Sequence, residues 1–243
     1  MKPILIIKAG CTFPSIAKRF GDFEDWILAG LGLPRTRFVV KAVFRGEALP
    51  APGSLSGVVI TGSHSMVSEW EPWNEPLARW LPAAVAAEIP LLGICYGHQL
   101  LARVTGGEVW PNPLGRQMGT AEIRLTAGAK KDPLLGGLPK TFLGIVAHRE
   151  CVRQPPPAAV VLATAAHDLH HAFRIGRCAW GVQFHPEFSE DIVRAYIEER
   201  RALLEGEGRD AAKMLASVRP APQAGTLLQR FAGIVKDDEG GKA

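Results

Sequence analysis

A cysteine between two glycines is the feature of this sequence best suited to covalent chemistry. Cys95 stands in Gly93-Ile94-Cys95-Tyr96-Gly97-His98-Gln99, directly after a short apolar run and before a helical pattern. A strand that turns sharply into a helix through glycines is typical of a nucleophile elbow, here with cysteine in place of serine. The helix N-terminus supplies free N–H groups and partial positive charge, which favour a thiolate and a neighbouring oxyanion. The alternative is a buried structural cysteine, and the glycines on both sides argue against it.

A thiolate nucleophile needs a base, and His185 is the best candidate among the seven histidines. It stands in Gly181-Val182-Gln183-Phe184-His185-Pro186-Glu187-Phe188, at the end of an expected strand. The carboxyl ends of strands in a parallel sheet form the edge where sites are built. Glu187 follows two residues later, where a carboxylate can fix the imidazole tautomer and stabilise its protonated form. A histidine in an ordinary core or turn position is the alternative for His185 taken alone.

The elements that must position these residues alternate between strand and helix in the first half of the chain. Such alternation predicts a parallel sheet covered on both faces. We expect strands over 4–7, 38–44, 58–61 and 90–95, and helices over 22–31, 73–88 and 99–104.

The second half is richer in strands. Residues 120–125, 142–147, 160–165, 172–175 and 179–184 are expected as strands, and 190–204 as the last well-defined helix. We therefore predict an α/β fold with a mixed, mainly parallel central sheet flanked by helices. Residues 1–205 are expected to form the main domain. Residues 206–243 are expected to be a C-terminal extension that packs on it, with a short docking helix over 226–235 and a frayed tail from residue 236.

Composition narrows the function classes. The 243 residues are 47% hydrophobic and 21% charged, which excludes wholesale disorder, and the net charge of +4 is scattered rather than clustered. Nucleic-acid binding and a polybasic membrane patch are therefore not indicated. The first apolar run is too short for a signal peptide, and no run is long enough to span a bilayer. The four cysteines form no CxxC pair, so we expect a reduced, cytoplasmic protein.

The elbow and the distal Gly-Val-Gln-Phe-His-Pro-Glu-Phe motif resemble the paired signatures of class I glutamine amidotransferases. The resemblance is closest to the amidotransferase domain of GMP synthase and its stand-alone relatives, and it extends from Ile4 to about Ile197. It implies that Cys95 attacks the side-chain amide of L-glutamine, with His185 as general acid/base and Glu187 as its orienting partner. Ammonia is released, and water then frees glutamate from a γ-glutamyl thioester. This chemistry needs neither a cofactor nor a metal.

The resemblance also implies which residues contact glutamine. Gln99 matches a glutamine-binding position, and the counterpart of His148 lies near the glutamine pocket. The loop Thr61–Val67 matches the family's oxyanion loop, where a backbone N–H of Gly62 or Ser63 would act together with the N–H of Tyr96. Ser63 replaces a second glycine and His64 replaces a proline of the family pattern, so the identity of the donor is not determined by the match.

Other candidates for chemistry are weaker. His167-Asp168-Leu169-His170-His171 is rich enough in ligands for Zn²⁺, yet no Cys/His partner set at finger spacing accompanies it. We interpret it as a polar surface loop near a partner interface rather than a metal site. Cys11, Cys151 and Cys178 lack an elbow and are expected to be packing residues.

Three functions remain open. The first is a glutaminase that supplies ammonia to a separate synthetase, because the sequence contains neither the phosphate loop of the GMP synthase ATP-pyrophosphatase domain nor a Walker loop. The second is a γ-glutamyl peptidase that uses the same triad. The third is a catalytically silent regulatory module, which would have no need of all three triad residues. The oligomeric state and the ammonia acceptor are not indicated.

Overall fold

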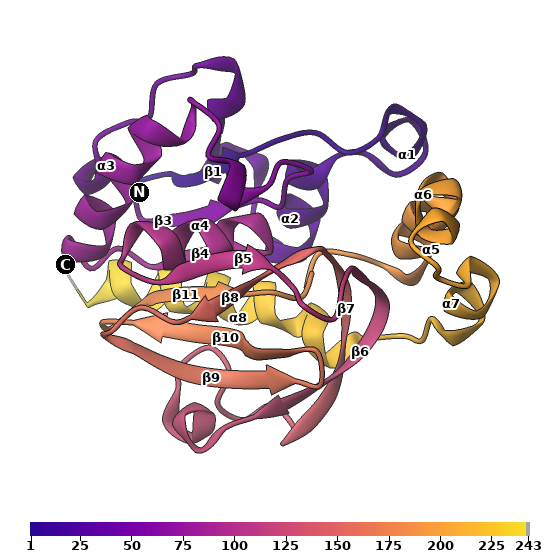
Figure 1. The fold of residues 1–243 in the computed structure, drawn as a ribbon. Helices are drawn as coiled ribbons and strands as arrows, with labels where there is room; N and C mark the ends of the chain where they lie inside the picture. Colours follow the sequence, from indigo (N-terminus) through magenta and orange to yellow (C-terminus); the bar gives the residue numbers. More distant parts are fainter. Residues whose placement is uncertain (242–243) are drawn as a thin grey trace.

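A nine-stranded sheet forms the centre of the computed structural model, which describes residues 1–241 (Figure 1). The strand order is β2-β1-β3-β4-β11-β10-β9-β6-β7. The first five strands are parallel: β2 (Phe38–Ala42), β1 (Ile4–Lys8), β3 (Gly57–Ile60), β4 (Leu91–Ile94) and β11 (Ala179–Val182). The other four continue the sheet antiparallel: β10 (Asp168–Ile175), β9 (Ala159–Ala165), β6 (Gln117–Leu125) and β7 (Thr141–His148). The mixed α/β sheet expected from the sequence is confirmed.

A second sheet was not predicted. It pairs β5 (Glu108–Pro111) with β8 (Glu150–Gln154) in antiparallel fashion. In β5 only Val109 is buried, so the segment lacks the apolar alternation by which a strand is recognised.

Eight α-helices accompany the sheet within the described residues. They are α1 (Pro14–Phe20), α2 (Phe23–Leu31), α3 (Asn74–Ala86), α4 (Tyr96–Val104), α5 (Glu190–Glu199), α6 (Arg201–Gly206), α7 (Ala211–Ser217) and α8 (Pro222–Gly240). The single helix expected over 190–204 is interrupted at Arg200, which has φ −102° and ψ 12° and separates α5 from α6.

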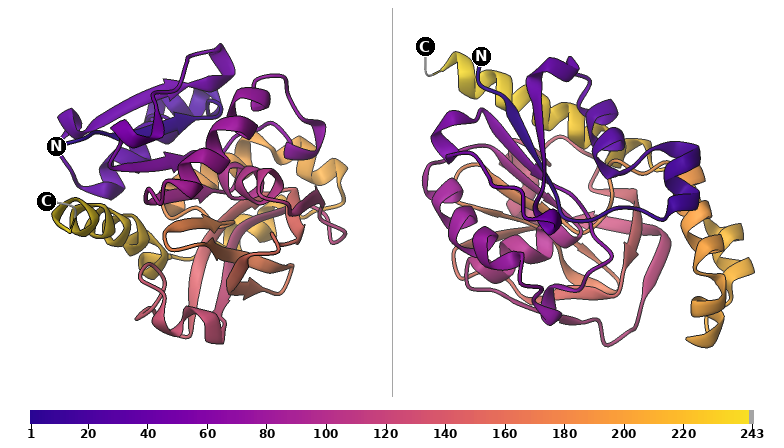
Figure 2. Two further views of the ribbon diagram at one scale, coloured as in Figure 1. Left: turned by 90° about the vertical axis from the view of Figure 1, so that its left-hand side faces the viewer. Right: turned by 90° about the horizontal axis from the view of Figure 1, so that it is seen from above.

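Both faces of the parallel half are buried, and β1 shows how. Ile4 and Ile6 pack on one face in a cluster that includes residues of α2 and α8. Leu5 and Ile7 pack on the other face in a cluster that includes residues of α3 and α4. Burial on both sides explains why the parallel strands are continuous apolar runs rather than alternating ones. Figure 2 shows the helices on the two sides of the sheet.

The C-terminal extension packs on the rest of the chain. Helix α8 contacts α2 and β7, and it buries Leu227, Leu228 and Phe231 against the sheet. The frayed tail predicted from residue 236 is wrong for 236–240, because α8 continues to Gly240 and Glu239 pairs with Arg37 at 2.9 Å. These residues carry no apolar pattern, and ion pairing contributes to their order. Residues 242–243 lie outside the described part, and the domain boundary at residue 205 stays a prediction.

The polar surface loop predicted over His167–His171 is also wrong. Strand β10 begins at Asp168, and Asp168 and His171 are 4% and 0% exposed. Asp168 pairs with Ala165 of β9 across a tight turn. The prediction failed because polar side chains here face the interior, so the apolar pattern starts only at Ala172.

Helices α1 and α5–α7 gather at one side of the molecule, at the right of Figure 1. Phe188, Ile192 and Tyr196 belong to the third buried cluster, which holds α5 against the sheet. Along residues 1–241, every helix is too short or too polar to cross a bilayer.

Candidate active site

The turn from β4 into α4 carries Cys95 in a strained conformation. Cys95 has φ 51° and ψ −98°, a positive φ that costs a residue with a side chain about 1–3 kcal/mol. A Cβ at Gly93 would collide with the carbonyl of Gly97, and a Cβ at Gly97 would lie 2.7 Å from the Cβ and carbonyl of Ile60. Both glycines of the motif are therefore required by close backbone approach. The elbow expected from the sequence is present.

His185 follows β11 and lies at the same sheet edge as Cys95. Its Nδ1–H donates to Oε1 of Glu187 at 2.7 Å, and both residues are buried. Burial alone would lower the pKa of His185, but the negative charges of Glu187 and Cys95 outweigh it and raise the pKa to about 10. The imidazole is therefore protonated at neutral pH beside Cys95.

Aromatic and backbone contacts hold the imidazole in place. The ring stacks on Phe188 with centroids 4.0 Å apart, and the His185 N–H donates to the carbonyl of Ile145 in β7 at 2.8 Å. On the other side lies Gly62, where a Cβ would approach Cε1 of His185 to 3.2 Å. A larger residue at position 62 would press on the imidazole, which gives the glycine a reason independent of its backbone angles.

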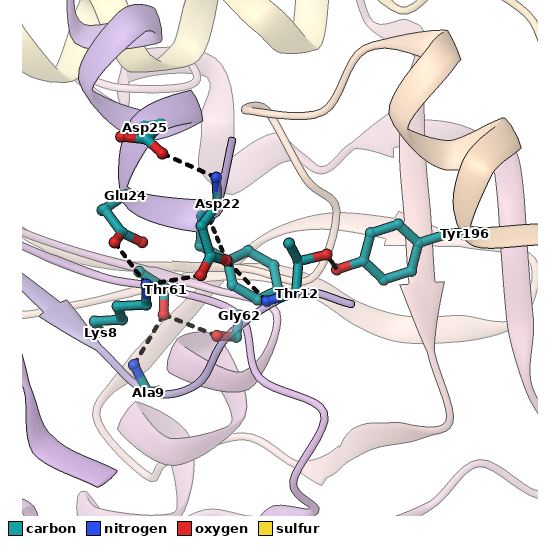
Figure 3. Close-up of polar contacts among 10 residues, drawn as sticks. Lys8, Ala9, Thr12, Asp22, Glu24, Asp25, Thr61, Gly62 and Tyr196 are labelled. Carbon is teal, nitrogen blue, oxygen red and sulfur yellow. Dashed lines mark hydrogen bonds and ion pairs between the residues drawn. The ribbon is translucent and has the colours of Figure 1, made fainter. Parts of the chain in front are cut away.

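In the loop after β3, the side chain of Thr61 fixes the orientation of the peptide group between Gly62 and Ser63. The Thr61 hydroxyl accepts from the N–H of Ala9 at 3.0 Å and donates to the carbonyl of Gly62 at 2.8 Å (Figure 3). Because the peptide is trans, the N–H of Ser63 points away from that carbonyl. Within residues 1–241, neither this N–H nor that of Tyr96 donates a hydrogen bond. Two backbone donors are thus free near the elbow.

A partly buried ion-pair network lies next to this loop. Lys8, the last residue of β1, contacts Asp22 at 2.7 Å and Glu24 at 2.5 Å. Asp22 also accepts from the N–H groups of Thr12 and Phe23, both at 2.8 Å, and caps α2 (Figure 3). The network holds Phe23, whose ring lies near the position of a Gly62 Cβ, at 3.4 Å.

A cleft opens over Cys95. Gln99 lies in its wall and donates from Nε2 to the carbonyl of Glu150 and to Oε1 of Gln183, both at 2.9 Å. Its own carbonyl oxygen is left for a ligand. His148 also lines the cleft, while the Tyr96 hydroxyl turns away to donate to Asn74 at 2.8 Å. The structure therefore brings all eight predicted site residues to one region, with Tyr96 contributing its backbone.

Several cleft residues were not predicted. They include the cations Arg116, Arg149 and Arg200, together with Glu150 and Tyr196. Oε2 of Glu150 accepts from the N–H of Ser68 at 3.2 Å, whereas its buried Oε1 has no hydrogen-bond partner among residues 1–241. Arg149 and Glu150 directly follow His148, so their sequence position was a usable signal. The sequence contains no such signal for Arg200, because it lies within a segment with an ordinary helical pattern.

The other cysteines differ from Cys95. Cys151 and Cys178 are buried, and Cys11 is half-buried. Burial raises the pKa of the Cys151 thiol to about 12. None of the three follows a strand-to-helix turn, in keeping with a packing role.

Comparison with known proteins identifies the family of this chain. The family model "Glutamine amidotransferase class-I" matches residues 52–201. A GMP synthase (glutamine-hydrolysing) of Aeropyrum pernix is 39% identical over 143 residues, which are 58% of this chain and 25% of that protein. The chain thus spans only a quarter of the length of this relative.

Two further matches cover more of both chains. Gamma-glutamyl peptidase 5 of Arabidopsis thaliana is 30% identical over 205 residues, 82% of this chain and 81% of the peptidase. The crystal structure of a glutamine amidotransferase from Methylobacillus flagellatus superposes with a TM-score of 0.76 at 24% identity, over 99% of this chain and 95% of that one. The chain belongs to the class I glutamine amidotransferase family.

Proposed function

We propose that this protein hydrolyses the side-chain amide of L-glutamine through a γ-glutamyl thioester on Cys95 and supplies the ammonia to a separate synthetase. The observation that carries the proposal is the geometry around Cys95. A strained elbow, a protonated His185 paired with Glu187, and free backbone donors meet at one sheet edge.

The first half-reaction forms the thioester. The Cys95 thiolate attacks the amide carbon, and the N–H groups of Ser63 and Tyr96 stabilise the oxyanion that develops. One such donor is typically worth about 3–4 kcal/mol in the transition state. The carbon–nitrogen bond then breaks as the His185 imidazolium gives its proton to the departing nitrogen, and ammonia leaves.

The second half-reaction releases glutamate. His185, now neutral, accepts a proton from water, whose oxygen attacks the thioester carbon. The carbon–sulfur bond breaks, which regenerates the thiolate beside the imidazolium. Glu187 accepts the hydrogen bond from Nδ1–H throughout, so that Nε2 remains the atom that exchanges protons.

The cleft is suited to the amino-acid end of the substrate. Arg149 takes part in no ion pair among the described residues and is free to bind an α-carboxylate, whereas Arg116 is paired with Glu207 at 3.1 Å. The unpartnered Oε1 of Glu150 is suited to an α-ammonium group. The carbonyl of Gln99 adds a neutral acceptor in the same wall.

A γ-glutamyl peptidase is the second candidate, and the comparisons favour it on length. The Arabidopsis peptidase is matched over 81% of its length, compared with 25% for the Aeropyrum GMP synthase. Chemically the two candidates differ only in the leaving group, which is ammonia in one case and the amine of a second amino acid in the other.

The deciding experiment measures ammonia release from glutamine and amine release from γ-glutamyl dipeptides with the same purified protein, and Cys95→Ser as the control. Our proposal predicts turnover of glutamine that is slow in kcat, because Ser63 and His64 depart from the family's oxyanion loop. Adding the synthetase partner should raise kcat. Brisk hydrolysis of dipeptides with glutamine as a poor substrate would favour the peptidase. Turnover of neither would indicate a silent module.

A further inference from the structure

Two histidines and a carboxylate converge at the wall of the cleft, and most of their polar side-chain atoms have no hydrogen-bond partner among residues 1–241. His148 ends β7, while Asp168 and His171 lie in β10, and all three are buried. One ligand atom from each lies within 4.8 Å of the other two. Among residues 1–241, neither ring nitrogen of His148 or His171 makes a hydrogen bond, and Oδ2 of Asp168 makes none either.

We propose that this cluster binds one first-row divalent cation, with Zn²⁺ as the expected metal. Two imidazoles and a carboxylate form a donor set that Zn²⁺ accepts, whereas Mg²⁺ prefers oxygen ligands alone. At bond lengths of about 2.0–2.1 Å, tetrahedral ligands lie about 3.3 Å apart, so the three side chains need to close by at most about 1.5 Å. The fourth position of such a site would be taken by water.

The carboxylate of Asp168 has no cationic partner among the described residues, which favours a bound cation over a cluster of water molecules. Oδ1 of Asp168 accepts from the N–H of His170 at 2.9 Å, but no Lys or Arg in the described chain pairs with this carboxylate. A buried carboxylate without a cation is costly, and neutral imidazoles cannot supply the missing charge. A divalent cation would pair with the charge of Asp168 and accept a lone pair from each histidine, which leaves a net charge of +1 on the site.

The position of the cluster gives the cation a structural role. The carbonyl of His171 accepts from the N–H of Gln183 at 2.9 Å, and the His171 ring stacks on Phe184 at 5.9 Å. Gln183 and Phe184 directly precede His185, whose own N–H bonds to β7. A metal that joins β7 to β10 would therefore clamp the segment carrying His185.

The test uses the full-length protein, freed of metal with a chelator and then titrated with Co²⁺, Zn²⁺ and Mg²⁺. We expect one equivalent of Co²⁺ to produce visible d–d absorption bands, Zn²⁺ to displace it, and Mg²⁺ to have no effect. Zn²⁺ should also raise the melting temperature of the metal-free protein, since a ligand that binds only the folded state stabilises it. Absence of both the bands and the thermal shift would overturn the proposal and leave buried water as the occupant.

Variants assign the ligands. Asp168→Asn and His171→Gln should each weaken Co²⁺ binding by at least about 100-fold, because even supporting residues of metal sites cost 10–100-fold when removed. His170→Gln is the matched control: His170 lies on the same strand, but its Nδ1 is 2.8 Å from the carbonyl of Val152. The His170→Gln variant should bind Co²⁺ as tightly as the unmodified protein does. Metal binding that survives Asp168→Asn, or that is lost equally in His170→Gln, would contradict this site.

Discussion

Two buried histidines lie near each other in this fold, and their pKa values are shifted in opposite directions. His185 sits on the parallel half of the sheet, paired with Glu187 and close to Cys95, and its pKa is raised to about 10. His148 sits at the end of the antiparallel strand β7 without a hydrogen bond, and burial, together with the charge of His185, lowers its pKa to about 3. Both are almost inaccessible to solvent.

Burial disfavours the charged form of both rings, so the difference comes from their partners. A carboxylate at 2.7 Å and a cysteine raise the pKa of one histidine, while its unpaired neighbour stays neutral. A neutral imidazole is also the form that can bind a metal or accept a hydrogen bond. The same residue type thus has a raised pKa in one half of the sheet and a lowered pKa in the other.

The largest expected effect comes from removing the charged pair. Cys95→Ala and His185→Ala should each lower kcat by roughly 10⁴-fold or more, because a nucleophile and its base act as a unit. The double variant should be no worse than either single one. Steady-state kinetics check this, with circular dichroism to verify folding. Substantial turnover in His185→Ala would show that another group serves as the base.

Removing only the partner carboxylate should have an intermediate effect. Glu187→Gln leaves the hydrogen bond but deletes the charge that raises the pKa of His185, so kcat should fall by about 10²-fold with activity retained. In the unmodified protein kcat/KM should stay level above pH 7 and decline as pH rises through about 10, where His185 loses its proton. In the variant this decline should occur at lower pH. An unmoved alkaline limb would mean that Glu187 does not control the charge of His185.

The ion pair between Lys8 and Asp22 tests whether charged partners outweigh burial elsewhere in the protein, with the free energy of unfolding as the readout. Burial alone would raise the pKa of Asp22, but hydrogen bonds from Lys8, Thr12 and Phe23 outweigh it and hold the pKa below its ordinary value. The stabilisation is therefore present above about pH 4 and is lost as pH falls through the lowered pKa.

Asp22→Asn should accordingly lower the free energy of unfolding by about 1–3 kcal/mol at pH 7, and by less at pH 3. Urea denaturation at both pH values measures the difference. Glu122→Gln is the control, since its ion pair with Arg124 is mostly exposed and should contribute less than about 1 kcal/mol. Equal destabilisation by Asp22→Asn at both pH values would rule out the ionic origin.

The smallest catalytic effect is expected at the uncharged histidine. In the metal-free protein, His148→Gln should change KM for glutamine by less than about tenfold and leave the pH limbs of kcat/KM in place, because the ring is already neutral throughout the working range. The matched comparison is Glu187→Gln, which should move the alkaline limb. A limb that moves in His148→Gln would show that His148 titrates with the reacting groups.

The parts of this site that the sequence predicts well are those encoded locally. Cys95 lies between glycines that only close backbone approach explains, and His185 and Glu187 are two residues apart, so each motif contains its own geometry. The parallel strands can also be predicted from the sequence, because burial on both faces makes them continuous apolar runs.

The parts that escaped prediction are assembled from distant segments. His148 and His171 meet only because β7 and β10 lie on either side of the chain leading to His185, and no spacing in the sequence records this. Buried polar residues in β10 looked like a surface loop for the same reason. The end of α8 was missed because its contacts include ion pairs to Arg37 and Arg177 rather than an apolar stripe.

Selective modification of Cys95 tests the central claim most directly. A glutamine analogue with a chloromethyl ketone in place of the amide should alkylate one cysteine per chain, because the attacking thiolate displaces chloride. Peptide mapping by mass spectrometry should find the label on Cys95. Cys11, Cys151 and Cys178 should remain largely unmodified, since none has a positioned base or an elbow, and glutamine should protect Cys95 in competition. In His185→Ala the labelling rate should drop sharply. A label that falls mainly on another cysteine, or labelling of Cys95 that ignores His185, would contradict the account of a thiolate–imidazolium pair at this site.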